Sequence, residues 1–198
     1  MSNQTILPTI QTNYLLAAIN DTQAVIRQVD TKLGILMTIF AIPLTKLGVI
    51  YAKCDATIKS NTGCMSSLCV ILTAIFVVAW IVGFIAAFRG LVGIDNPSEH
   101  VSGIKPKGTF YGGGLFKPMG YADIVFNDNK LTEKNLEQQF LELPATVEDI
   151  HRELLFEQSK IVYIRSVKLY RMKHAFMFGF AWLSTGFLIW IINLATKG

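Results

Sequence analysis

The sequence has little charge and few cysteines, and each shortage argues against a class of protein. Only 16% of the 198 residues are charged, whereas 52% are hydrophobic, and a typical soluble domain carries about 25% charged residues. The three cysteines, Cys54, Cys64 and Cys69, have no histidine near them, so a zinc site is not expected. A Cys54–Cys64 disulfide would need an oxidising compartment, and free thiols are the favoured state.

Recognisable catalytic and phosphate-binding motifs are also missing. The histidines His100, His151 and His174 are scattered, and no serine or cysteine stands in a recognisable nucleophile setting. Neither GxxxxGK[ST] nor GxGxxG after a strand occurs. We therefore expect no enzymatic activity and no cofactor or metal. The acidic residues near the start of the last helical segment are interpreted as a solvated face: Glu148, Asp149, Glu153 and Glu157.

What the chain does have is three long apolar runs, at 33–51, 68–88 and 175–195. A helix needs about 20 apolar residues to cross a ~30 Å hydrocarbon core, and all three runs are long enough. The second and third contain no charge, whereas the first contains Pro43 and Lys46. Buried helices of soluble proteins are usually shorter and more mixed in polarity. The sequence therefore predicts a mainly α membrane protein with three transmembrane helices.

The runs divide the chain into four parts. Residues 1–32 form an N-terminal amphipathic helix, 33–88 a transmembrane hairpin, 89–174 a cytosolic module, and 175–198 the third transmembrane helix with a short tail. Within the first part, positions that step by four and three form a heptad seam, apolar except for Thr22. These positions are Leu15, Ile19, Thr22, Ile26, Val29 and Leu33, continuing to Leu36 and Phe40 in the first span.

Helix and first span are therefore predicted to form one rod. The seam has to be covered, either by the cytosolic part of the same subunit or by another subunit of a homo-oligomer, and both interpretations remain open.

The orientation follows from lysine and arginine, which are retained on the cytoplasmic side of a membrane. With three spans, residues 1–32 and 89–174 share one side and hold most of the flanking cations. The other side, which comprises a loop at 52–67 and the C-terminus, carries only Lys53, Lys59 and Lys197. We expect the N-terminus and the module in the cytoplasm. The net charge of +4 lies beside the membrane, so the bilayer rather than nucleic acid is the expected partner.

The module 89–174 is predicted to be a small α+β unit. Residues 90–128 contain several prolines, three consecutive glycines and interspersed aromatic residues, which indicates turns and short strands. A helix at 131–143 ends before Pro144, and a capping box of Thr146 and Asp149 precedes one helix that would continue through the third span. That helix, from Val147 to Ala195, would be ~70 Å long and would connect the module mechanically to the bilayer.

Three charged residues at or inside the first span are candidates for gating. Asp30 and Lys32 lie where the first helix meets the bilayer and are expected to pair or to snorkel. Lys46 is the lone charge within a span. It either snorkels to the interface or faces a water-filled path between subunits.

Two segments of the chain resemble segments of one known protein family. The stretch QAVIRQVDTKLGILMTIFAIPL, at 23–44, is similar to that family's opening, in which an amphipathic helix ends in an Asp-x-Lys step, here Asp30 and Lys32. The stretch QSKIVYIRSVKLYRMKHAFMFGF, at 158–180, is similar to the family's last cytosolic helix, and the matching polar positions in it are Ser159, Lys168 and Arg171. The family that these segments resemble is the Pycsar transmembrane effectors.

The resemblance implies a bacterial antiphage effector in the inner membrane. Such an effector senses a cyclic pyrimidine mononucleotide through its cytosolic module and then permeabilises the membrane. The expected ligand-binding residues, which include an aromatic-glycine step at 110–112, are Lys105, Lys107, Phe110, Tyr111, Gly112 and Lys117. The expected gating or subunit-contact residues are Asp30, Lys32, Lys46, Ser159, Lys168 and Arg171.

A different class of function is also compatible with the sequence. In this alternative the chain is a structural membrane subunit that recruits a soluble defence partner through the heptad seam and binds no nucleotide. Likewise, the glycines and lysines at 105–117 could form a membrane-hugging loop instead of a phosphate site.

Overall fold

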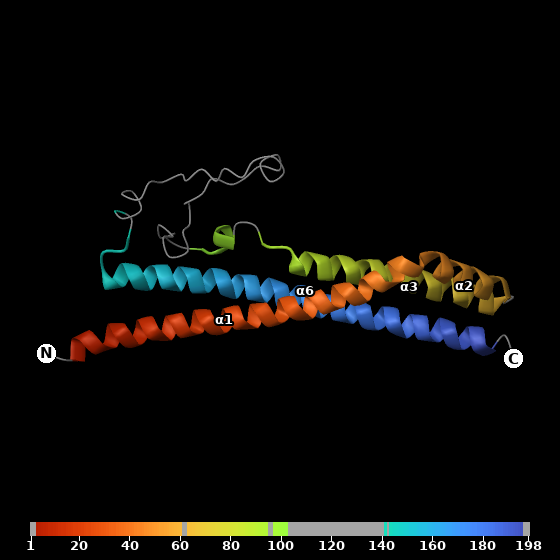
Figure 1. Cartoon of the computed structure of the whole chain (residues 1–198), viewed down its shortest axis with the longest axis horizontal. Helices are drawn as coiled ribbons and strands as arrows, with labels where there is room; N and C mark the ends of the chain where they lie inside the picture. The colour runs from red at the N-terminus through yellow and green to blue at the C-terminus, as the bar shows by residue number, and fades with distance from the viewer. Residues whose placement is uncertain (1–2, 61–62, 95–96, 103–140, 142, 196–198) are drawn as a thin grey trace. The chain divides into compact units, whose positions relative to one another are not determined.

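The structure, a computed structural model, describes residues 3–60, 63–94, 97–102, 141 and 143–195, with side chains from Pro8 onward. Helices make up nearly all of this part of the chain, and it contains no strand. The predicted mainly α fold is confirmed, but the described residues give no support to an α+β module; most of 90–128 and the helix predicted at 131–143 lie outside them. The elements are α1 (Asn3–Ala41), η1 (Ile42–Lys46), α2 (Leu47–Ser60), α3 (Cys64–Leu91), η2 (Pro97–His100) and α6 (Val147–Ala195) (Figure 1).

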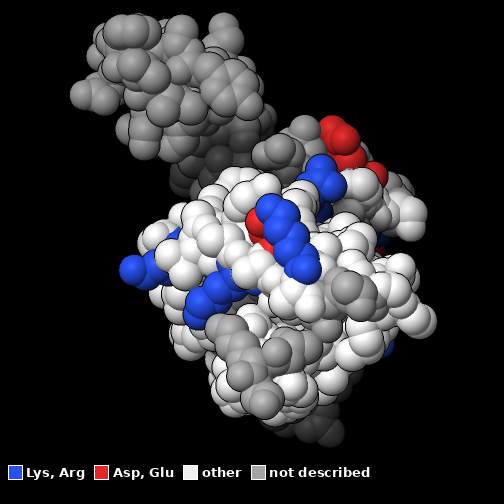
Figure 2. All heavy atoms as spheres, turned by 90° about the vertical axis from the view of Figure 1, so that its right-hand side faces the viewer, with Lys and Arg blue, Asp and Glu red and all other residues white. Residues whose placement is uncertain are grey.

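Three helical stretches in the described residues are long and apolar enough to cross a membrane: Pro8–Ser60, Cys64–Leu91 and Val147–Ala195. Their outward surfaces are also apolar. Val78 on α3 is 58% exposed and Phe180 on α6 is 75% exposed. On the face drawn in Figure 2, uncharged side chains cover most of the coloured surface. Large exposed apolar surfaces are unfavourable in water and are matched by lipid, so these helices have the character of a membrane protein.

The first apolar run is not one straight helix. α1 ends at Ala41, the chain continues through the short 3₁₀ helix η1, and α2 begins at Leu47. Pro43 causes the break, because its ring displaces the carbonyl of Ile39 and its nitrogen has no hydrogen to donate. In a 3₁₀ pattern that missing N–H would serve the carbonyl of Phe40. Trp80 on α3 supplies the donor instead, with its indole Nε1 2.8 Å from that oxygen.

The loop predicted at 52–67 is too long, because most of these residues are helical. α2 continues to Ser60 and α3 already begins at Cys64. The polar residues that suggested a loop stabilise the helix instead, since Lys59 and Asp55 form an i,i+4 ion pair at 2.8 Å. Gly63 immediately precedes α3, and its φ of +62° lies in the left-handed region that side chains disfavour. α2 and α3 therefore form a tight helical hairpin.

The chain divides into two compact units. The first comprises residues 1–24 and 95–164, and the second 25–94 and 165–198. The helices α1 and α6 each contribute residues to both units without a break. As predicted, α1 extends from the N-terminal segment into the first apolar run, and α6 is one helix that includes the third.

The core of the second unit pairs large side chains of α1 with small ones of α3. Leu33 and Phe40 of α1 are at most 1% exposed, and they lie in one cluster with Ala79 and Ala87 of α3. Trp182 of α6 completes this cluster. Small residues on one helix let a neighbouring backbone approach closely, which is the usual way helices pack in membranes.

The heptad seam is buried within a single chain. In the first unit, Leu15 is 7% and Ile19 is 1% exposed. In the second unit, Val29 is 3% exposed, and Leu33 is fully buried. The predicted seam is thus confirmed, and the same subunit covers it, so no second copy is needed for that purpose. A homo-oligomer would have to use another surface.

The start of α6 has the predicted cap. The Asp149 backbone N–H donates to the Thr146 hydroxyl at 3.1 Å, and that hydroxyl donates to the Asp149 carboxylate at 2.6 Å. The interpretation of the following acids as a solvated face is wrong for two of them, since Glu153 is 6% and Glu157 is 3% exposed. Both share the inward face of α6 with Leu154. Glu157 forms an ion pair with Lys160 one turn further on, although its buried Oε1 has no hydrogen-bond partner among the described residues.

Candidate functional site

Polar groups of α1, α3 and α6 meet the apolar core of the second unit at one place, which we call the three-helix junction. It consists of Asp30 and Leu33 of α1, Arg89 and Gly90 of α3, and Lys168 and Arg171 of α6.

An ion pair between Lys168 and Asp30 connects α6 to α1 at the junction. Lys168 lies seven residues after Ile161 and seven before Ala175, both of which are buried, so it occupies a core position of α6. Its side chain is 8% exposed, whereas that of Asp30 is 37% exposed. A buried ammonium group is costly without a counter-charge. Asp30 provides that counter-charge, and its own side chain remains partly exposed.

Arg171 connects α6 to the end of α3. Its Nη1 donates to the backbone carbonyl of Arg89, near the helix end at Leu91. The last four carbonyls of a helix have no partner within the helix, and the helix dipole favours a cation there. Arg171 therefore caps α3 from outside, one turn of α6 beyond Lys168.

Close packing accompanies these polar contacts. A Cβ placed on Gly90 would lie 2.7 Å from Cδ1 of Leu33 and 3.6 Å from Cβ of Arg171. No side chain larger than hydrogen fits at residue 90 unless its neighbours move. Leu33 is fully buried at this point. The junction thus combines charge pairing with direct contact between the three helices.

Further along the spans, the ring of Phe40 fills a space left by glycines. A Cβ on Gly83 of α3 would lie 2.7 Å from its Cζ, and one on Gly179 of α6 would lie 3.2 Å from it. The ring of Trp182 is tilted against Phe40, with 5.8 Å between ring centroids. The indole Nε1 of Trp182 is buried and has no hydrogen-bond partner in the described part of the chain. Phe40 therefore fixes how closely all three helices approach.

The first unit has a polar contact of its own between α1 and α6. Nε2 of His151 lies 2.9 Å from the Thr12 hydroxyl and 3.3 Å from the Pro8 carbonyl. Because Thr12 donates its own hydrogen to Pro8, His151 is best placed to donate its ring N–H to these two oxygens. The two long helices are therefore joined by polar contacts in each unit.

The structure brings together only part of the predicted gating set. Asp30, Lys168 and Arg171 meet at the junction. By contrast, Lys32 and Lys46 are exposed and have no ion-pair partner among the described residues. Ser159 is exposed as well, and its hydroxyl donates to the carbonyl of Leu155 within the same helix.

The predicted ligand-binding residues lie outside the described residues: Lys105, Lys107, Phe110, Tyr111, Gly112 and Lys117.

Four small residues of the second span are not among the site residues predicted from the sequence. Ala79, Gly83, Ala87 and Gly90 are buried on α3, and they follow one another at steps of four, four and three. That spacing places them on one helix face, so a small-residue stripe was visible in the sequence. The carbonyl of Arg89 had no such signal, because every residue carries one.

The contacts at the junction hold the three helices together. The junction pairs charges and packs helices, and it contains no nucleophile next to a general base. Elsewhere in the described residues, no group of His, Cys, Asp and Glu is arranged to hold a metal ion. No protein-family model, no curated protein and no solved structure matches this chain.

Proposed function

We propose that this chain is a membrane effector whose cytosolic part binds a cyclic pyrimidine mononucleotide and whose spans then permeabilise the bacterial inner membrane. The observation that carries the proposal is the Lys168–Asp30 ion pair. It joins two helices, α1 and α6, that each continue without a break from the first unit into an apolar span. Such a pair can couple events outside the bilayer to helix packing within it.

The proposed mechanism is a shift between two packings of the spans. In the resting state, Lys168 and Arg171 hold α6 against α1 and α3. Ligand binding in the module 89–174, for which we retain the prediction of a small α+β unit, would displace the start of α6. Because α6 is continuous, a displacement near Val147 reaches the junction and alters both contacts. A ligand with a preference of about 5 kcal/mol for one state is sufficient to reverse such an equilibrium.

The ligand class rests on the sequence. The segments 23–44 and 158–180 resemble the Pycsar effectors, and Asp30, Lys168 and Arg171 are among the matching polar positions. Lysines at 105, 107 and 117 flank a glycine run and an aromatic pair, which together suit a phosphate and a planar base. We place the N-terminus and this module in the cytoplasm, because the flanking cations favour that side.

The surface through which a scaffolding subunit would recruit its partner is buried within the chain. Recruitment of a soluble partner was inferred from the heptad seam, but Leu15, Ile19 and Val29 are buried within the chain. A partner would have to bind elsewhere. We therefore favour the effector.

Release of a dye from liposomes tests the proposal directly. The purified protein is reconstituted with a trapped dye, and cyclic UMP or cyclic CMP is added, with cyclic AMP as the control ligand. We expect binding and dye release with a pyrimidine nucleotide. If neither pyrimidine nucleotide binds, the sensing proposal is wrong; if one binds without release, the permeabilising proposal is wrong.

Junction variants test the coupling in the same assay. Lys168→Gln and Asp30→Asn remove the ion pair, and we expect each to raise the leak without ligand or to lower the ligand concentration for release. Lys173→Gln on α6 and Asp21→Asn on α1 are matched controls, because both side chains are exposed and lie outside the junction. Equal behaviour of all four variants would remove the junction from the mechanism.

A further inference from the structure

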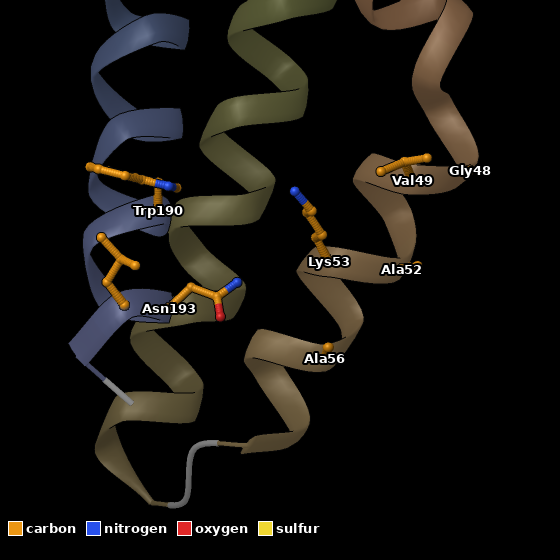
Figure 3. Close-up of a pocket in the computed structure, with 8 residues that line it drawn as sticks. Gly48, Val49, Ala52, Lys53, Ala56, Trp190 and Asn193 are labelled. Atoms are coloured by element: carbon orange, nitrogen blue, oxygen red, sulfur yellow. The ribbon is translucent and has the colours of Figure 1, made fainter. Parts of the chain in front are cut away.

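A groove lies between α2 and α6 in the second unit (Figure 3). Its volume is about 510 Å³, within the ~300–1,000 Å³ range of small-molecule sites. The residues that line it come from both helices: Gly48, Val49, Ala52, Lys53 and Ala56 of α2, and Trp190, Asn193 and Leu194 of α6. The groove belongs neither to the three-helix junction nor to the proposed nucleotide site.

Most of the groove is apolar and long in the direction of the helices. On the α2 side, Gly48, Ala52 and Ala56 follow at intervals of one helical turn and leave the wall without bulky side chains. On the α6 side, Trp190 and Leu194 form an apolar wall one turn long. This shape suits an extended hydrocarbon chain.

A cation interrupts the apolar lining. Among the described residues that line the groove, Lys53 is the only charged one, and Figure 3 shows Lys53 of α2 and Asn193 of α6 extending into the space between the helices. No carboxylate in the described residues forms an ion pair with Lys53, whereas nearby Lys59 is paired with Asp55. The Lys53 ammonium can therefore pair with an anionic group that enters the groove.

The position of the groove fits a membrane interface. Lys53 lies two turns before the end of α2 at Ser60, in a stretch that also contains charged residues. Trp190 lies within ~8 Å of the end of α6, measured along the helix. Lysine and tryptophan are the residues that occupy the level of lipid headgroups.

We propose that this groove binds one anionic phospholipid. The acyl chain lies along the small residues of α2 and against Leu194, and the phosphate lies near the Lys53 ammonium and the Asn193 amide. This assignment is independent of the proposed nucleotide sensing. A second copy of the chain is a poorer occupant, because a two-fold contact brings the same patch onto itself and would set Lys53 against its own equivalent. Like charges repel strongly in a weakly polar environment.

Tryptophan fluorescence provides the test. Trp190 is 56% exposed, whereas Trp182 is 9% exposed and Trp80 donates inward to Phe40. The protein is reconstituted in phosphatidylcholine with equal small fractions of brominated phosphatidylglycerol or brominated phosphatidylcholine, because bromine quenches nearby indoles. We expect roughly twofold more quenching by the anionic lipid, as local attraction to the cation predicts. Trp190→Phe should abolish this excess.

Two lysine variants then locate the headgroup. In Lys53→Gln, brominated phosphatidylglycerol should quench no more than brominated phosphatidylcholine does. Lys59→Gln, on the same helix, should keep the excess quenching by the anionic lipid. If wild-type protein shows no excess, or if both variants lose it equally, the proposed site is wrong. Loss of the excess on addition of inorganic phosphate would assign the groove to free phosphate instead of lipid.

A second variant, which keeps Lys53, tests the site independently of whether Lys53→Gln folds correctly. Ala52→Leu fills the groove from the α2 side and should also reduce the excess quenching, since the acyl chain loses its space. Unchanged quenching in Ala52→Leu contradicts the proposal. Lys53→Cys chains that cross-link to one another would place a second copy in the groove and would likewise overturn it.

Discussion

The ring of Phe40 on α1 lies so close to Gly83 on α3 that a methyl group at residue 83 would be 2.7 Å from its Cζ. The same methyl group would also be 3.4 Å from Cβ of Phe178 on α6. A contact below 3.0 Å requires something to move, and the aromatic ring is held by Trp182. Gly83 is therefore needed for the close approach of the three helices, and a larger side chain there should destabilise the protein.

We expect Gly83→Ala to destabilise the protein by about 1–3 kcal/mol, the usual cost of overpacking a core. Thermal unfolding in detergent, followed by intrinsic fluorescence, measures the effect. Gly34→Ala is the control, because a Cβ there has no atom within 4 Å and alanine favours the helix. Phe40→Leu should recover part of the loss in the Gly83→Ala protein. An equal response of Gly83→Ala and Gly34→Ala would contradict the packing argument.

The hydrogen bond from Trp80 to the Phe40 carbonyl should be coupled to Pro43. Trp80→Phe removes the donor and is expected to cost about 1 kcal/mol or more, since the carbonyl is left unsatisfied. In a Pro43→Ala background the chain regains a backbone N–H, so Trp80→Phe should cost less. A double-mutant cycle by thermal unfolding measures this coupling. Trp190→Phe, at an exposed position, serves as the control, and additive effects of the two core changes would refute the coupling.

The predicted orientation can be tested with the native cysteines. Cys64 begins α3 and is exposed, whereas Cys69 is 1% exposed and Cys54 is only partly exposed; none of the three forms a disulfide. If the cations place the N-terminus inside, a membrane-impermeant maleimide should label Cys64 on bacterial spheroplasts. Cys64→Ser should reduce that labelling to background. Labelling that requires permeabilised membranes would mean the opposite orientation.

Much of the fold could be predicted because its signals are periodic. The seam that runs from Leu15 through Ile19 to Leu33 is visible as alternating steps of four and three, and burial follows that register. The continuation of α2 to Ser60 was missed because the polar residues there were interpreted as a loop, although Lys59 and Asp55 form an ion pair that stabilises the helix. Likewise, the acids of α6 were assigned to solvent by residue type alone, whereas Glu157 lies at a core position of the helix.

The candidate site could be predicted only in part, for a different reason. Asp30 and Lys168 were each singled out, but a single sequence does not say which charges pair across 138 positions. The small residues at Gly83 and Gly90 were recognisable by spacing and were overlooked. The contact of Arg171 with a backbone carbonyl depends on where α3 ends, and helix ends are the least certain part of any prediction from sequence.

Exchanging the charges of Asp30 and Lys168 tests whether their pairing holds α1 to α6. Lys168→Asp alone places a second negative charge beside Asp30, and Asp30→Lys alone sets two cations together; we expect each to destabilise the protein by about 1–3 kcal/mol, because Lys168 is buried. The double exchange restores opposite charges and should regain at least half of that loss in thermal unfolding. Lys173→Asp is the control for an exposed position of α6. If the double exchange is as unstable as the sum of the single ones, the two residues are not coupled, and the junction has to be attributed to packing of Leu33 and Gly90 alone.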